Sequence, residues 1–307
     1  MDADKNVAAE RTIRIEQIDP LVRCGAGGSQ MQYAIGYFIA LFIALTGVGA
    51  GTLTVPVLVL FLGVPAQAAV GIGLAFSAAV KSILAPAQIL RGNVRWRTLG
   101  FMLLGGIPGV LAGSLLLKGL AGAGSSNLFH AALGAILVGT ASLQIVSFFR
   151  PMRPREGRSD RSSLLAWLMF PVGAEVGFAS AGAGALGSAA LMSLTQLAPA
   201  QVAGTDIVFG LLVSLAGSGA HWFSQAGDPA LLLHLVLGGA AGAASGVLLS
   251  ERIPRRPLRL ALWVWLLLLG GQFLFSSYRA WASPAPRGNA PAEVRSAGNP
   301  SGGVRAK

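Results

Sequence analysis

Charged side chains are scarce in this sequence. Only 11% of its 307 residues are Asp, Glu, Lys or Arg, whereas a soluble domain carries about 25%. This scarcity excludes an ordinary soluble globular protein, because 53% of the residues are hydrophobic and need a solvent other than water. The sequence therefore predicts an all-α, polytopic membrane protein. Apolar runs long enough to cross a bilayer as helices recur at 33–62, 66–90, 98–117, 128–149, 163–197, 200–224, 230–249 and 258–278.

Residues that bind metals are few and scattered. Cys24 is the one cysteine, which excludes an intramolecular disulfide and a cysteine-based metal site. The histidines, His130, His221 and His234, form no close-spaced cluster with Asp or Glu, and His221 is most simply explained as an interfacial residue near the end of its span. We therefore expect no metal, no cofactor and no enzymatic activity. A membrane-embedded enzyme is the weakest alternative, because it would need a catalytic constellation that the sequence does not contain.

Acidic residues are fewer than basic ones, 12 against 23, which gives a net charge of +11. The arginines gather in short loops beside the apolar runs, at 91–97, 150–161 and 252–259. Basic loops of this kind mark the cytoplasmic side of a membrane protein. The charge therefore indicates topology, and we expect no nucleic-acid partner.

The two halves of the chain resemble each other. A shift of 133 positions places the glycines of the first half on those of the second, including a matched GG-x-x-G-x-x-x-G that begins at Gly105 and Gly238. We interpret this as a duplication. The predicted parts are an N-terminal polar segment 1–32, a first membrane repeat 33–149, a basic linker 150–162, a second membrane repeat 163–279, and a disordered tail 280–307 rich in Pro, Gly, Ala and Arg.

Equivalent loops of the two halves differ in charge. The loop at 91–97 has three arginines, whereas its counterpart at 225–229 has only Asp228. The loop at 118–127 has one lysine, whereas its counterpart at 250–259 has four arginines. The positive-inside rule then requires one half to be inverted relative to the other. Inverted repeats are the common plan of secondary transporters, whose substrate site lies near the midplane where the repeats meet.

Three glycines interrupt the first apolar run in the stretch GVGAGTLTVP, at 47–56. The stretch does not fit a dinucleotide-binding loop, because Thr52 stands where the third glycine is needed. The loop charges fit only if each of the runs 33–62 and 163–197 is a pair of elements. We therefore expect about five helical elements in each repeat, beginning with a broken or re-entrant hairpin. Backbone that is not helical at that depth must be buried in protein or line a cavity.

The other glycines of the repeat have a simpler interpretation. Small residues four positions apart let two membrane helices approach closely. For the glycines from Gly105 to Gly113 and from Gly238 to Gly246 we expect this close packing and no ligand contact.

The order of these motifs resembles the TauE/SafE sulfite exporter family. In the first half, GxGxG is followed by LGVPAQAAVG and LRGNV; in the second, GAGALGSAALM is followed by LAPAQVAGTD, GGAAGAASG and RIPRRPLR. The resemblance covers residues 34 to 276. It implies a bacterial inner-membrane permease, multi-pass, that carries small sulfur-containing anions such as sulfite or organosulfonates and is coupled to the proton gradient. The first repeat departs from the family pattern, because Gly71-Ile72 replaces the usual Gly-Thr that Gly204-Thr205 retains.

Half-helix N-termini at the two glycine breaks could bind an anion, because they offer free N–H groups and positive partial charge. Lys81 could add a counter-charge, since it lies roughly 15 Å along its helix from Arg91. Hydroxyl groups could donate to the substrate or could simply bond their own helix backbone. The predicted substrate-binding residues are Gly47, Gly49, Gly51, Thr52, Lys81, Gly182, Gly184, Ser188 and Thr205.

Two carboxyl groups lie within the apolar runs. Asp206 follows Gly204-Thr205, where it could cap a helix or carry a proton in coupled transport. Glu175 has no acidic counterpart in the first repeat, where Phe42 takes its place. We predict proton coupling through Asp206 and Glu175. The leading hypothesis is a secondary carrier for a small anion; an anion channel of the same architecture is the main alternative, and homo-oligomerisation is left open.

Overall fold

The computed structural model describes residues 27–46, 50–122, 126–149, 162–181, 184–222, 229–249 and 255–282. Within these ranges the chain is all-helical, which confirms the predicted fold class. The helices of the first half are α3 (Gly27–Thr46), α4 (Ala50–Phe61), α5 (Ala66–Leu90), α6 (Trp96–Gly122) and α7 (Ser126–Phe149). Those of the second half are α8 (Leu164–Ala179), α9 (Ala185–Leu194), α10 (Pro199–Trp222), α11 (Pro229–Leu249) and α12 (Arg255–Ala282).

Seven of the described helices are long and apolar enough to cross a membrane: α3, α5, α6, α7, α10, α11 and α12. Both long runs that contain the glycine breaks are split into two helices, as predicted. The first splits between Thr46 and Ala50, the second between Ala179 and Ala185. The protein is therefore a multi-pass membrane protein with a short helix in each half.

The outer helices extend slightly beyond the predicted membrane repeats. Helix α3 begins at Gly27, inside the segment expected to be polar, and α12 continues to Ala282, inside the expected tail. At the start of α3 the polar side chain of Gln32 is buried, and its Oε1 lies 2.6 Å from Nδ1 of His234 on α11. A polar residue with a partner in this packed position lets the helix extend past the apolar run.

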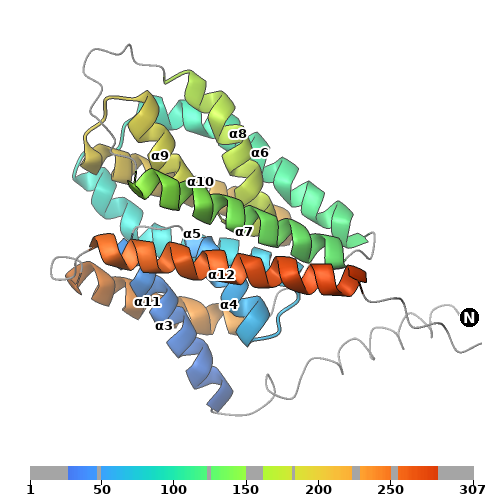
Figure 1. Cartoon of the computed structure of the whole chain (residues 1–307). Helices are drawn as coiled ribbons and strands as arrows, with labels where there is room; N and C mark the ends of the chain where they lie inside the picture. The colour runs from blue at the N-terminus through green and yellow to red at the C-terminus, as the bar shows by residue number, and fades with distance from the viewer. Residues whose placement is uncertain are drawn as a thin grey trace, which may run out of the picture.

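Helices of each half of the chain pack against helices of the other half (Figure 1). Helix α8 lies along α6, α3 lies along α11, and α7 and α12 run side by side. Helices α5 and α10 pack against each other at the centre of the bundle. The basic linker 150–161 lies outside the described residues, and so do most of the N-terminal segment and of the tail.

Glycines set the close approach of the outer helix pairs. A β-carbon on Gly105, Gly109 or Gly113 of α6 would overlap a backbone carbonyl of α8, and one on Gly238 or Gly242 of α11 would overlap a carbonyl of α3. The overlapped carbonyls belong to Ala166, Phe170 and Ala174 in the first pair and to Tyr33 and Tyr37 in the second. These partners obey the same shift of 133 positions as the glycines. The packing interpretation of these glycines is therefore confirmed, and these two helix pairs make equivalent contacts.

Equivalent helices at the centre of the bundle run antiparallel. Along α5 and α10, the Ser214 hydroxyl donates to the Ser77 hydroxyl at 3.2 Å, while Lys81 lies against Gly210. As residue numbers rise along α5, the numbers of the residues that they contact on α10 fall. Helices α7 and α12 show the same order.

The direction of the helices fixes the course of α9. Helix α8 runs parallel to α6, and α6 runs parallel to α10, because Gly106 contacts Phe209 while Val110 contacts Gly217. Since α8 and α10 point the same way, the 10-residue α9 between them must return toward the end at which α8 begins. This course matches the predicted hairpin and disagrees with a single broken crossing.

Candidate functional site

The start of α4 and the end of α8, which flank the two breaks, meet inside the bundle. Gly51, in the first turn of α4, packs directly against Ser180, the residue that ends α8. A β-carbon at Gly51 would overlap the carbonyl oxygen and the hydroxyl of Ser180. The start of α4 in the first half is thus packed against the end of α8 in the second.

Ser180 is the residue that terminates α8. Its φ of 56° lies in the left-handed region, which ends a helix and which usually requires glycine. The first half has Gly47 at the equivalent position. The Ser180 side chain is buried, and its Oγ has no hydrogen-bond partner among the described residues.

A charged cluster lies further along the same interface, at Lys81, Ser188 and Asp206. The Lys81 side chain on α5 and the Asp206 side chain on α10 are 7% and 6% exposed. Lys81 Nζ packs against Gly210, one helical turn from Asp206, so the two charges lie near each other. The sequence alone does not show that these two residues are neighbours; the antiparallel packing of α5 against α10 brings them together.

Ser188 connects Asp206 to the start of α9. Its hydroxyl oxygen lies 2.8 Å from Asp206 Oδ2 and 2.8 Å from the carbonyl oxygen of Gly184. One hydroxyl proton can be donated to only one of these acceptors at a time. When Asp206 is ionised, Ser188 can donate to it. When Asp206 is protonated, the carboxyl can donate to Ser188, which then donates to Gly184. The geometry therefore accommodates both protonation states.

Glycines make room for the two charges. The second carboxylate oxygen of Asp206, Oδ1, is buried, has no hydrogen-bond partner among the described residues, and lies against Gly187. A β-carbon at Gly187 would overlap this oxygen, and one at Gly210 would overlap Lys81 Nζ. Sequence reasoning missed the role of both glycines, although their position beside Ser188 and one turn after Asp206 was a usable signal.

The charged cluster has no equivalent among the residues related to it by the shift of 133 positions. In the repeat register, Asp206 corresponds to Gly73, Ser188 to Val55, and Lys81 to Ser214. The contact of Ser188 with Asp206 is replaced by a contact of Val55 with Gly73. A symmetric scaffold thus carries its charges on one side only.

The remaining predicted substrate-binding residues lie in three places. Thr52 is buried in the first turn of α4, and Gly184 precedes the first turn of α9. Thr205 accepts a hydrogen bond from the backbone N–H of Arg95 at 3.0 Å, so its hydroxyl faces the arginine-rich loop and not the charged cluster. Gly47, Gly49 and Gly182 lie outside the described residues.

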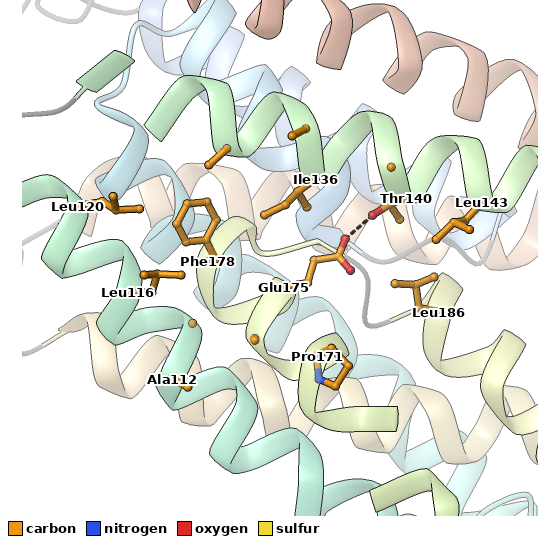
Figure 2. A pocket seen from close by; sticks show the side chains of 15 residues that line it. Ala112, Leu116, Leu120, Ile136, Thr140, Leu143, Pro171, Glu175, Phe178 and Leu186 are labelled. Carbon is orange, nitrogen blue, oxygen red and sulfur yellow. Dashed lines mark hydrogen bonds between the residues drawn. The ribbon is translucent and has the colours of Figure 1, made fainter. Parts of the chain in front are cut away.

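Glu175 lies apart from the charged cluster, on α8. Its Oε1 accepts a hydrogen bond from the hydroxyl of Thr140 on α7. The carboxyl forms part of the wall of a separate pocket between α6, α7 and α8 (Figure 2). Its predicted role in proton coupling therefore stays a prediction that does not involve the cluster.

His221 lies in the last turn of α10, at the end of its span as expected. Its side chain is buried, and Nε2 lies 3.3 Å from the carbonyl oxygen of Gly177 on α8. Lys118 donates to the neighbouring carbonyl of Ala220 at 2.8 Å. The small residue Gly71 on α5 leaves room for the imidazole ring.

Comparison with known proteins agrees with this architecture. Residues 33–273 match the family described as "Sulfite exporter TauE/SafE". The chain is also similar to a protein of Bacillus subtilis (strain 168) named "Probable membrane transporter protein YjnA", with 29% identity over 234 residues, which cover 73% of this chain and 91% of that protein. No solved structure matches the chain. Because the family match spans the whole membrane core, this chain belongs to the TauE/SafE family of membrane transporters.

Proposed function

We propose that this protein is a secondary carrier for a small sulfur-containing anion such as sulfite or an organosulfonate, coupled to protons. The observation that carries the proposal is the buried cluster of Lys81, Asp206 and Ser188 beside the short helix α9. In this proposal Lys81 is the counter-charge of the substrate and Asp206 carries the proton.

Charge balance supports the assignment of Lys81. An ionised group inside a membrane protein is costly unless it is paired. Lys81 and Asp206 balance each other when the site is empty. An incoming anion would leave one negative charge in excess, which protonation of Asp206 would remove. Binding of a monoanion together with one proton therefore keeps the site neutral.

The hydroxyl of Ser188 supports the assignment of Asp206. Because Ser188 contacts both Asp206 and the Gly184 carbonyl, the protonated and the ionised carboxyl each find a hydrogen-bond partner without a change in the backbone. A group that must gain and lose a proton in each transport cycle benefits from such an arrangement.

Antiparallel packing of equivalent helices supports alternating access by inverted repeats. The two short helices, α4 and α9, would bring their N-termini and hydroxyls toward the substrate from opposite sides of the membrane. In this orientation the arginine-rich loop 91–97 faces the cytoplasm of a bacterial cell and the protein resides in the inner membrane.

Transport by purified protein in proteoliposomes tests the proposal. Sulfite uptake should saturate with concentration and should move protons, as measured with a pH-sensitive dye trapped inside the vesicles. Lys81→Ala should abolish both fluxes. Lys118→Ala is the matched control, since Lys118 binds the Ala220 carbonyl at the far end of α10, and it should retain them.

Two outcomes would overturn the proposal. Unchanged uptake by Lys81→Ala would remove Lys81 from the site. Large currents that do not saturate with substrate would identify the anion channel, which is the alternative function for this architecture.

A further inference from the structure

A second site lies between α6, α7 and α8, away from the charged cluster. It is a pocket of about 670 Å³, within the range of roughly 300–1,000 Å³ that small-molecule sites occupy. Its walls are alanine, glycine and large apolar side chains, among them Leu116, Ile136 and Phe178. Figure 2 shows Glu175 and Thr140 facing each other within this apolar lining.

The pocket opens toward the apolar outer surface of the helix bundle. Leu116 and Leu143, which line it, are each 59% exposed. Exposed leucines on membrane-spanning helices face lipid, so a ligand would enter sideways from the bilayer. The ligand must therefore have an apolar body.

Glu175 is the one ionisable side chain among the residues that line the pocket. No Lys, Arg or His lines the pocket, and the hydrogen bond that the described residues give to Glu175 comes from the neutral hydroxyl of Thr140. A carboxylate in such surroundings lacks a compensating charge, which is costly within a membrane. A cation would supply it.

We propose that this pocket binds a hydrophobic organic cation, with its charge next to Glu175 and its apolar body against α6 and α7. The preference is opposite to that of the site beside Lys81, so the two sites take different molecules. Helix α9 contributes a residue to both sites. Leu186 lines the pocket, and Ser188, two positions further along, contacts Asp206.

Two rigid ions of the same shape and opposite charge test this inference. Tetraphenylphosphonium is the cation and tetraphenylborate the anion, and saturable binding of each is measured on the full-length protein in nanodiscs, with empty nanodiscs subtracted. The wild-type protein should bind the cation and not the anion. Glu175→Gln, which keeps the shape of the side chain, should weaken binding of the cation at least about tenfold, as expected for loss of a charged partner.

Two further variants separate charge from folding and from transport. Ala135→Trp should block the cation by filling the pocket without touching the carboxyl. Lys81→Ala should bind the cation as the wild type does, so that failure of the transport proposal leaves this result unaffected. Equal binding of the cation by Glu175→Gln, binding of both ions alike by the wild type, or binding of neither ion would each overturn the inference.

Discussion

Replacing Lys81 by methionine removes one charge of the buried pair while keeping a long, flexible side chain in its place. Asp206 would then be a buried carboxylate without its counter-charge. Removing one partner of a buried ion pair costs about 3–5 kcal/mol, whereas replacing both by neutral groups is often close to neutral. Both side chains are almost fully buried, so neither charge can be stabilised by water. The cost of removing one should be large if the other charge relies on it for compensation.

A double-mutant cycle measures this dependence. Lys81→Met and Asp206→Asn are each expected to lower the free energy of unfolding by about 3 kcal/mol, and the double variant should be more stable than either single variant. Effects of this size imply an interaction free energy of at least about 3 kcal/mol, the upper end of the range for residues that interact.

The assay is reversible unfolding of the purified protein in mixed micelles with increasing SDS, followed by far-ultraviolet circular dichroism. All three variants should lose anion uptake, because the double variant restores stability without restoring either charge. Strictly additive effects on the free energy of unfolding would refute the pairing of Lys81 with Asp206 and leave both as separate polar residues.

Three other predictions concern the neighbouring contacts. Ser188→Ala should fold but lower proton-coupled uptake at least about tenfold, because it removes the hydroxyl that serves both states of Asp206; unchanged uptake in the dye assay would contradict this. Gly109→Leu should prevent accumulation of folded protein, because its side chain would overlap the Phe170 carbonyl. The control Gly100→Leu should be tolerated, because a β-carbon at Gly100 has no neighbour within 4 Å. Gel filtration distinguishes folded from aggregated protein, and equal behaviour of the two variants would contradict the packing role of Gly109. Cysteine labelling, with Cys24 replaced, should place Arg91 and Asp228 on opposite sides of the membrane, and labelling of both from one side would exclude the inverted arrangement.

The sequence predicted the helical class, the internal repeat and the position of both breaks. These features are visible without a structure because they depend on short-range properties. Apolar runs must match the thickness of a bilayer, and glycines that allow two backbones to touch return at fixed spacing. The break between α8 and α9 was predicted from its glycines, yet the residue that ends α8 is Ser180, whose φ of 56° lies in the left-handed region.

The candidate site could be predicted only in part. Lys81, Asp206 and Ser188 were identified as polar residues in apolar runs, but the sequence contains no signal that joins the first to the other two. Glu175 was placed with Asp206 on chemical grounds, and the structure puts it in a separate pocket with Thr140.

The sequence by itself therefore determined what the protein is made of: membrane-spanning helices, duplicated, with a break in each half. The tertiary structure alone decided which polar groups meet. Lys81 lies near Asp206 because α5 and α10 pack antiparallel, and Ser188 contacts Asp206 because α9 turns back. The physical reason is that hydropathy and helix breaks depend on neighbours along the chain, whereas the pairing of buried charges depends on the direction and register of helices far apart in it.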